Sequence, residues 1–308
     1  MKRLEFRAMG CRMLAVLDSD VEPAGERLAQ VPGWFEVWEQ RLSRFRSDSE
    51  LCRVNDRSGA PLPLSPVLWD VCQAAIEAER LSGGLVQPTM LDALEAAGYD
   101  RGFESLAAAQ ASEPSGLWAP DYGGPTEIHL DRASRSLFAP AGVRLDLGGI
   151  AKGWAADRAA RRLATCDPAL VDAGGDVAVS GPLANGQGWP IGVADPHSNT
   201  GRLVDTIALR RGGVATSGRD YRRWRRGGVW HHHILDPRTG LPAQTDVVSA
   251  TVVAPSAQLA ESAAKTAFIL GSEQGLSWLD HRTHLKGLLV LEDGRAVHSR
   301  LWKPVERD

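Results

Sequence analysis

The sequence has few cysteines and no long hydrophobic run. Its 308 residues include four cysteines, none in the Cys-x-x-Cys spacing that indicates a zinc site or a redox pair. No stretch approaches the roughly 18 consecutive apolar residues of a membrane-spanning helix. The first residues, MKRLEFRAMGCRM, contain neither the apolar core of a signal peptide nor a lipobox. We therefore expect a cytoplasmic protein without a disulfide framework and without a membrane segment.

The chain also lacks an excess of positive charge and the common nucleotide-binding motifs. Its 35 Lys and Arg residues and 38 Asp and Glu residues give a net charge of −3, which predicts no general attraction to nucleic acid or anionic membranes. Neither the GxxxxGK[ST] loop nor the GxGxxG fingerprint is present. Any phosphate site must therefore be of another kind.

Strand-like and helix-like segments follow one another irregularly along the chain. LEFRAMGCRMLAVLD is typical of two strands with a break at Gly10, and Trp34, Trp38 and Leu42 have helical spacing. Without a regular strand–helix–strand repeat, the expected class is α+β, with mixed, mainly antiparallel sheets and flanking helices. The length suits one domain over 1–308, and an Ala-, Ser-, Pro- and Gly-rich stretch predicts a surface connection at about 107–125.

The stretch RLDLGGIAKGWAADRAA, residues 144–160, places a glycine turn between a strand end and a helix. Bare backbone at a helix N-terminus offers free N–H groups and a positive dipole end, and Lys152 adds a cation. Two interpretations stay open on this stretch alone. One is a cradle for phosphate, and the other is a tight turn that uses glycine for positive φ.

Two further segments carry candidate chemistry. Thr216, Ser217 and Gly218 could approach a phosphate, although an ordinary polar turn explains them equally. In WHHHILDPRTG only His231 and His233 would share a face of an extended strand. No third ligand lies nearby, so zinc is disfavoured. A single histidine acting as proton acceptor is the favoured interpretation.

The segment APSAQLAESAAKTAFILG predicts a helix that Ser256 caps and Gly271 ends. Glu261 and Lys265 are four residues apart on it and therefore share a face, with small alanines around them. They are either part of a ligand site or a solvated ion pair worth about 0.2–0.5 kcal/mol.

Together these segments resemble the ApbE family of FAD:protein FMN transferases and their FAD-binding relatives. The resemblance runs from about Phe6 to Gly271 and rests on several long motifs in the family's order. They are MGC, LSRFRSDSELCRVN, LDLGGIAKGWAADRA, VDAGGDVAVSG, ATSGRDY, HHILDPRTGLP and VSATVVAPSAQLAESAAKTAFILG.

The resemblance implies FAD in a cleft between the lobes of a single α+β fold. Members transfer FMN from FAD to a Thr or Ser hydroxyl of a target protein and release AMP. By position it implies His233 as the catalytic base, an Asn55 like that of catalytic members, and a set of FAD contacts: Met9, Phe45, Leu85, Val86, Gln87, Gly148, Gly149, Ala151, Lys152, Trp154, Asp157, Thr216, Ser217 and Ile234.

The sequence departs from the family pattern where the resemblance implies Mg²⁺. The usual ligands are Asp and Thr oxygens and an alanine carbonyl, and the matching residues here are Glu261, Lys265 and Ala151. An ammonium cannot be a ligand, so we expect Lys265 to supply positive charge in the metal's place. Gln87 also replaces the family's acidic residue before Pro-Thr.

Three hypotheses follow for function. The chain is an FMN transferase acting on an acceptor protein, a non-catalytic FAD-binding protein with an edited metal site, or a pyrophosphatase that splits FAD into FMN and AMP. No acceptor motif of the form Asp-Gly-x-Ser-Gly-Ala-Thr occurs in the chain, so self-flavinylation is not expected.

Overall fold

The computed structural model of this chain describes residues 1–308 except 22, 109–127, 166, 227–228 and 304–308. The described chain forms two compact units. Unit 1 comprises Met1–Phe35, Lys152–Asp220 and Thr245–Asp308, and unit 2 comprises Glu36–Ala151 and Tyr221–Gln244. A single domain over the whole chain stays a prediction. All but the first two residues of the connection expected at about 107–125 lie outside the described residues.

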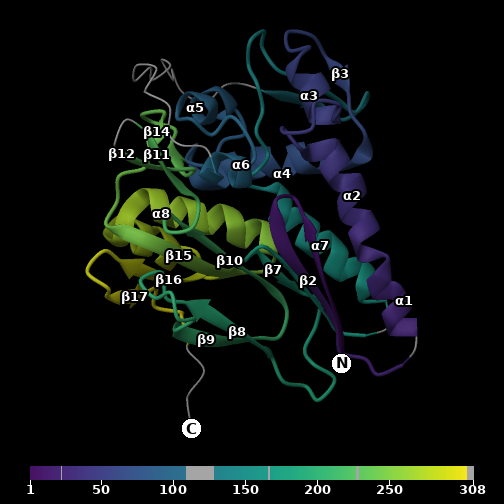
Figure 1. The fold of residues 1–308 in the computed structure, drawn as a ribbon, viewed down its shortest axis with the longest axis vertical. Coiled ribbons are helices and arrows are strands. Elements are labelled where there is room, and N and C mark those ends of the chain that lie inside the picture. Colours follow the sequence, from purple (N-terminus) through teal and green to yellow (C-terminus); the bar gives the residue numbers. More distant parts are fainter. Residues whose placement is uncertain (22, 109–127, 166, 227–228, 304–308) are drawn as a thin grey trace. The chain divides into compact units, whose positions relative to one another are not determined.

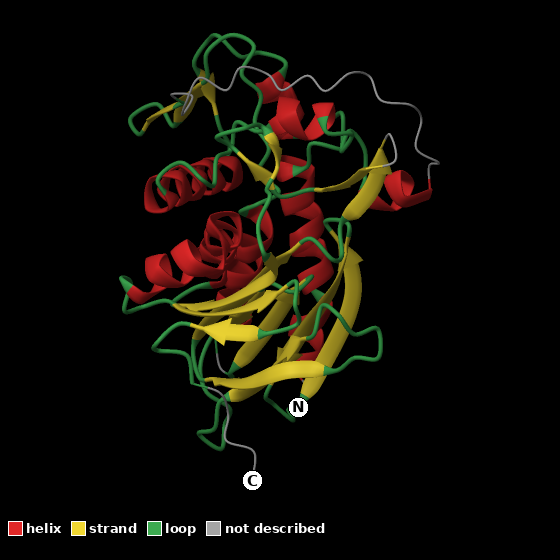
Figure 2. Ribbon diagram, turned by 90° about the vertical axis from the view of Figure 1, so that its left-hand side faces the viewer, coloured by secondary structure: helices red, strands yellow, loops and turns green. Residues whose placement is uncertain are grey.

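Unit 1 is built on an eight-stranded sheet whose neighbouring strands are all antiparallel. Figure 2 shows these strands side by side. In spatial order they are β1 (Lys2–Ala8), β2 (Cys11–Leu17), β6 (Ala169–Ala173), β7 (Val177–Val179), β10 (Gly212–Gly218), β15 (Val247–Ala254), β16 (Lys286–Leu291) and β17 (Ala296–His298). A separate antiparallel pair, β8 (Trp189–Ala194) and β9 (Leu203–Leu209), buries Trp189 and Ile207 in a core shared with this sheet.

The connection between β1 and β2 is a two-residue turn, because Ala8 pairs directly with Cys11. Met9 and Gly10 have φ angles of 49° and 67°, as a type I′ turn requires. The break expected at Gly10 is therefore a tight hairpin. Met9 adopts a left-handed conformation that costs a non-glycine residue about 1–2 kcal/mol.

Four helices have residues in unit 1, namely α1 (Pro23–Ala29), α2 (Val31–Leu42), α7 (Ala151–Leu163) and α8 (Ala257–Asp280). Helix α8 packs on β10, β15 and β16 (Figure 1). A Cβ on Gly213 would lie only 2.1 Å from the Ala257 nitrogen, so this approach requires glycine. Ser256 caps α8 as expected, with its hydroxyl accepting from Leu259 N at 3.2 Å.

The predicted end of this helix at Gly271 is a kink, because the helix resumes beyond it. Gly271 has φ 79° and ψ 178°, a conformation that interrupts the helix and favours glycine. Asp246 accepts a hydrogen bond from Ser272 N at 2.9 Å and thus caps the second segment.

Unit 2 contains the rest of α2 together with α3 (Glu50–Asn55), α4 (Pro66–Ser82), α5 (Leu91–Ala96) and α6 (Phe103–Ala108). Its small sheets are β3 (Leu62–Pro63), β5 (Ser136–Phe138) and β4 (His129–Asp131), then β11 (Arg223–Arg226) with β12 (Val229–His232), and β13 (Leu235–Asp236) with β14 (Leu241–Pro242). A core of Met90, Leu94, Tyr99, Trp224 and Leu235 joins α5 to the hairpins. Among the described residues, no helix is long and apolar enough to cross a membrane.

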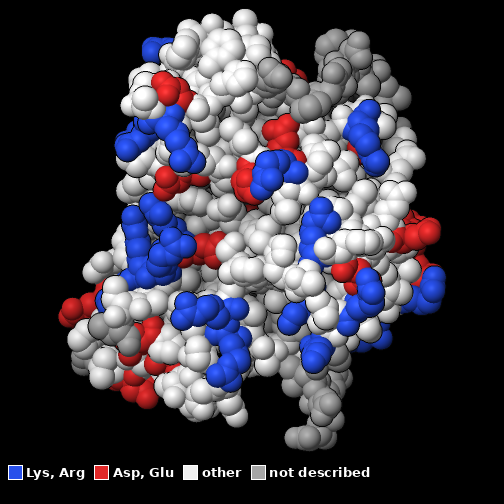
Figure 3. Space-filling view, turned by 180° about the vertical axis from the view of Figure 1, so that it is seen from behind, with Lys and Arg blue, Asp and Glu red and all other residues white. Residues whose placement is uncertain are grey.

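The surface carries charges of both signs. Figure 3 shows, on the face it presents, clusters of Lys and Arg side chains beside Asp and Glu side chains. On this face, side chains of the two signs lie beside one another.

Candidate active site

A buried charge cluster in unit 1 joins the start of α7 to α8. The Lys152 ammonium donates to Glu261 Oε1 at 2.9 Å and also to the Asp176 carboxylate. The side chains of Lys152, Asp176 and Glu261 are 16%, 3% and 5% exposed. Because so little water reaches these groups, their charges are compensated by one another instead of by solvent.

Asp176 reaches this cluster from a glycine turn. Gly174 and Gly175, between β6 and β7, have φ angles of 71° and 100°, which only glycine adopts readily. Asp172 Oδ1 accepts from Gly175 N at 2.7 Å, and Asp176 O accepts from Ala173 N at 2.9 Å. The turn is thereby closed on itself and places Asp176 in the interior.

Helices α7 and α8 bind each other's N-terminal ends through carboxylates. Glu261 Oε2 of α8 accepts from Gly153 N at 3.0 Å, while Asp157 of α7 accepts from Ala257 N at 2.9 Å and Gln258 N at 3.0 Å. Each acid satisfies free N–H groups at the positive end of the opposite helix. A Cβ on Gly153 would lie 2.7 Å from Ala257 O, so the contact depends on glycine.

This arrangement changes the interpretation of Asp157. Both of its carboxylate oxygens accept hydrogen bonds from the α8 backbone, and the side chain therefore stabilises the helix pair. The role of Asp157 as an FAD contact stays a prediction that these hydrogen bonds do not support. Lys152 and Glu261, by contrast, are brought together.

The pKa of Asp176 reflects opposing effects of burial and of the neighbouring charges. Burial, followed by the negative charge of Glu261, raises this pKa to about 7, and the positive charges of Lys152 and Lys265 oppose the rise. Lys265 is half-buried on α8. Two acids and two lysines therefore share one low-dielectric site.

The residues expected to hold Mg²⁺ do not form a site suited to it. Magnesium needs about six oxygen ligands in a tight octahedron, but here the Lys152 ammonium lies between the carboxylates of Asp176 and Glu261. Within the described part of the chain, no three His, Cys, Asp or Glu side chains are grouped to hold a metal. A ligand role for Ala151 and Glu261 stays a prediction that this donor set does not support.

The other candidates of unit 1 lie on β10, on α7 and at the first hairpin. Thr216 Oγ1 shares a hydrogen bond of 2.8 Å with Thr251 Oγ1 on β15, and the neighbouring Ser217 is 8% exposed. Trp154 is buried, with the Arg158 guanidinium 5.5 Å from its ring centroid. Met9 is half-buried in its turn.

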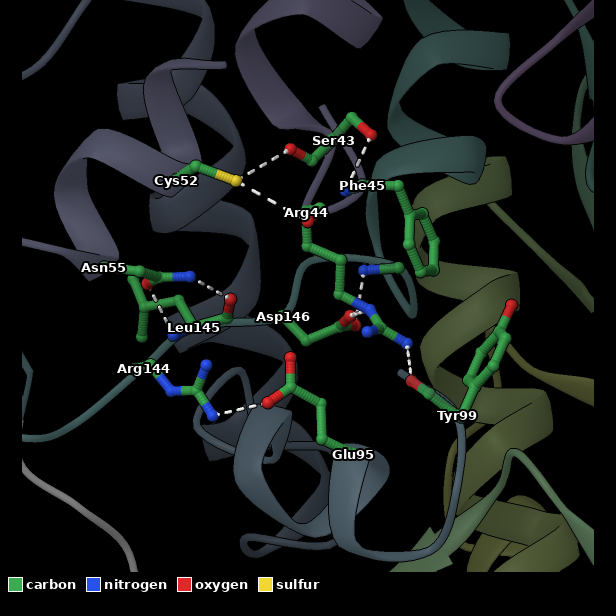
Figure 4. Close-up of polar contacts among 11 residues, drawn as sticks. Ser43, Arg44, Phe45, Cys52, Asn55, Glu95, Tyr99, Arg144, Leu145 and Asp146 are labelled. Atoms are coloured by element: carbon green, nitrogen blue, oxygen red, sulfur yellow. Dashed lines mark hydrogen bonds and ion pairs between the residues drawn. The ribbon is translucent and has the colours of Figure 1, made fainter. Parts of the chain in front are cut away.

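A second cluster, in unit 2, is centred on Arg44. Arg44 Nε pairs with Asp146 Oδ2 at 2.7 Å, and a second nitrogen donates to Tyr99 O at 2.6 Å. The guanidinium carbon lies 4.2 Å and 4.7 Å from the ring centroids of Phe45 and Tyr99 (Figure 4). The Arg44 side chain is 5% exposed, so it links Asp146 to Tyr99 in the interior of unit 2.

These contacts fix the start of the glycine turn predicted from sequence. Asp146 Oδ1 accepts from Gly148 N at 2.8 Å. Asn55 bonds both backbone groups of Leu145, donating to its carbonyl at 3.0 Å and accepting from its N–H at 2.8 Å (Figure 4). The Asn55 amide therefore positions the turn, whereas Phe45 remains 46% exposed beside it and offers an open aromatic surface.

The three histidines are not equivalent. His232 is 7% exposed and uses both ring nitrogens, with Nδ1 accepting from Ile234 N at 3.3 Å and Nε2 facing Ala243 O at 3.2 Å. His231 stacks on Trp224 at 6.4 Å. Strand β12 ends at His232, so the expectation that His231 and His233 share a strand face is wrong, and His233 lies in a bend.

The remaining predicted contacts of unit 2 are mostly interior. Ile234, Leu85, Val86 and Ala151 are 1%, 9%, 5% and 7% exposed, and Gln87 is half-buried.

The ApbE family model matches residues 9–289. The chain belongs to the ApbE family. This confirms the resemblance drawn from the motifs.

Similar proteins cover nearly the whole chain. A FAD:protein FMN transferase of Treponema pallidum is 32% identical in an alignment that covers 89% of this chain and 80% of that protein. A FAD:protein FMN transferase of Haemophilus influenzae is 29% identical over 83% of this chain and 76% of that protein. The crystal structure of the ApbE protein from Thermotoga maritima matches with a TM-score of 0.86 and 29% identity, covering 100% of this chain and 99% of that one.

The structural comparison confirms the α+β fold with mainly antiparallel sheets. The flavin transferase ApbE from Vibrio cholerae has the same fold at 23% identity, with a TM-score of 0.76 over 97% of each chain.

Sequence reasoning did not single out Arg44, Tyr99, Asp146 or Asp176 in this ApbE family member. Arg44 precedes Phe45, Asp146 lies two residues before Gly148, and Asp176 follows two glycines. Their positions beside a candidate FAD contact or a glycine turn could therefore have indicated these three charged residues from the sequence.

Proposed function

We propose that this chain is a FAD:protein FMN transferase that moves FMN from FAD to a Thr or Ser hydroxyl of an acceptor protein. The hydroxyl oxygen forms a bond to the FMN phosphorus, the pyrophosphate P–O bond breaks, AMP leaves, and the hydroxyl proton passes to a base. Family membership and relatives of that name along most of the chain support this function. The buried Lys152 ammonium, which follows Gly149 by three residues in the sequence, is the observation that carries it.

The proposed roles follow from the chemistry of the two clusters. Lys152 and the Gly148–Gly149 turn bind the pyrophosphate, because backbone N–H groups and a lysine both attract phosphate oxygens. His233 accepts the proton. Phe45 offers its exposed ring to the flavin or the adenine. Met9, Thr216, Ser217 and Ile234 are proposed on the flavin side.

Positive charge is needed where AMP leaves. We propose that Lys265 supplies it, because Lys152 is already paired with Asp176 and Glu261, and Lys265 is a second, half-buried ammonium whose charge acts on Asp176. Glu261 orients Lys152 through its 2.9 Å contact.

The first expected result concerns the reaction itself. With FAD and an acceptor that carries the threonine motif, the protein should release AMP and attach FMN, and EDTA should change the rate little. AMP is measured by chromatography and attached FMN by mass spectrometry. AMP with free FMN would instead identify a pyrophosphatase, and absence of AMP would identify a binding protein.

Substitutions of Lys265, which replaces the family's threonine, test the source of the positive charge. Lys265→Thr should weaken FAD binding in metal-free buffer, and Mg²⁺ should partly restore it, most fully in combination with Glu261→Asp. If Lys265→Ala leaves FAD affinity and AMP release unchanged, Lys265 is only a surface charge.

A second expected result is tighter binding of FAD than of FMN. The proposed cradle takes two phosphates, and FMN carries only one. Titration calorimetry with each flavin measures both affinities. Equal affinities would show that the AMP half is not recognised.

The identity of the acceptor protein and a cytoplasmic location both stay predictions.

A further inference from the structure

The β11–β12 hairpin of unit 2 presents an arginine–tryptophan surface. Arg225 pairs across the hairpin with Trp230, and Arg223 pairs with His232. Since alternate residues of a strand face the same side, Arg223, Arg225 and Trp230 share one face. The guanidinium carbons of Arg223 and Arg225 lie 4.7 Å and 5.1 Å from the Trp230 ring centroid. We call these three residues the Arg–Trp face.

The opposite side of the hairpin is anchored. Trp224 is 6% exposed, donates its indole N–H to Ala97 O at 3.1 Å and stacks on Tyr99 at 5.5 Å. This contact holds the hairpin beside the C-terminal end of α5 (Figure 1). The Arg–Trp face is therefore displayed on a supported element, with Trp230 52% exposed.

The charge of the hairpin has one sign. Between Asp220 and Asp236 the sequence contains four arginines and no acidic residue, within a chain of net charge −3. Among the described residues, Arg223 and Arg225 form no ion pair with a carboxylate and instead stack on the indole. Exposed guanidiniums already arranged over an aromatic ring are suited to carboxylates presented from outside.

We infer that the Arg–Trp face binds an acidic, extended segment of the acceptor protein, beside the hydroxyl that receives FMN. This inference rests on the proposed function and names the chemistry of its partner. In the part of the chain that the structure describes, β11 and β12 pair as strands only with each other, and an extended segment can add hydrogen bonds at the edge of such a sheet. Strand β12 ends at His232, and His233, the proposed base, is the next residue. An acceptor segment bound along β12 therefore ends close to His233.

A protein segment fits these observations better than a nucleic acid. Both guanidiniums already lie over the Trp230 indole, the surface on which a nucleobase would stack. The net negative charge of the chain also opposes a long polyanion.

The test uses the full chain and two fluorescent peptides that contain one threonine. In one peptide Asp and Glu residues flank the threonine, and in the other Asn and Gln replace them. Anisotropy is measured at about 0.02 M and 0.15 M salt, because screening weakens charge pairing as salt rises. The matched variants are Arg223→Glu/Arg225→Glu and Arg210→Glu/Arg211→Glu, which change the net charge equally. Arg210 and Arg211 are exposed residues between β9 and β10.

We expect the acidic peptide to bind about tenfold or more tightly than the neutral one, with affinity falling as salt rises. Arg223→Glu/Arg225→Glu should remove this preference while Arg210→Glu/Arg211→Glu keeps it, and FAD affinity should stay within about twofold in both. Equal binding of the two peptides, or equal loss in both variants, would overturn the inference. Tighter binding of a thymidine oligonucleotide or a phosphatidylserine vesicle than of the acidic peptide would also overturn it.

A failure of the proposed function can be distinguished from a failure of this inference: the proposed function is wrong if the wild-type protein releases no AMP from FAD. That assay uses the threonine-motif acceptor and does not depend on the anisotropy measurements.

Discussion

Replacement of His233 by alanine is expected to lower FMN transfer by about 10²–10⁴-fold, the usual contribution of a general base. FAD affinity should change little, because the base acts on the acceptor hydroxyl. Single-turnover kinetics measures the transfer step and calorimetry measures FAD binding. The acidic limb of the rate–pH profile should also disappear, which a purely structural role for His233 would not cause.

The neighbouring histidines provide matched controls. His232→Ala should lower the free energy of unfolding by about 1–3 kcal/mol, because the Ile234 N–H and the Ala243 carbonyl lose their buried partner. His231→Ala removes a stack on Trp224 and should leave most of the turnover intact. If His232→Ala lowers turnover in the folded protein more than His233→Ala does, the register that identifies His233 is wrong.

Replacement of Lys152 by methionine is expected to destabilise the protein by about 3–5 kcal/mol near pH 8, because it leaves Asp176 and Glu261 buried without their cation. The loss should be smaller near pH 5. Burial raises the pKa of Asp176 to about 7 in the folded chain, from an ordinary value of 3.8 for an aspartate exposed to water. Over that interval the folded state binds more protons than the unfolded state, so stability falls as pH rises. Without the positive charge of Lys152 the pKa of Asp176 rises further, so the pH interval over which stability falls extends to higher pH.

Urea unfolding at the two pH values measures this effect. Lys286→Met is the matched control, because Lys286 is exposed at the start of β16 and its loss should matter little at either pH. A destabilisation by Lys152→Met that is equal at both pH values, or no larger than that of Lys286→Met, would contradict the buried cluster. Lys152→Met should also abolish measurable FAD binding, whereas Lys286→Met should retain it.

Much of the local structure could be predicted because its causes are local. Ser256 caps α8 as predicted, and the two glycines before Asp176 form a turn between two strands. The kink at Gly271 was predicted only as an end. The continuation depends on Asp246, a residue distant in sequence that supplies the cap for Ser272. Likewise, β12 ends before His233, and no periodicity in WHHH marks that end.

The sequence by itself determined the fold class, the family and the list of candidate residues. These follow from motifs, glycine positions and hydrophobic spacing, which are properties of neighbouring residues. Only the tertiary structure decided the partners: Lys152 lies between Asp176 and Glu261, Asp157 caps α8, and Asn55 and Arg44 hold the glycine turn. Each of these contacts joins residues far apart in the chain. Burial then determines their strength, because a charge removed from water must find its counter-charge wherever the fold has placed it.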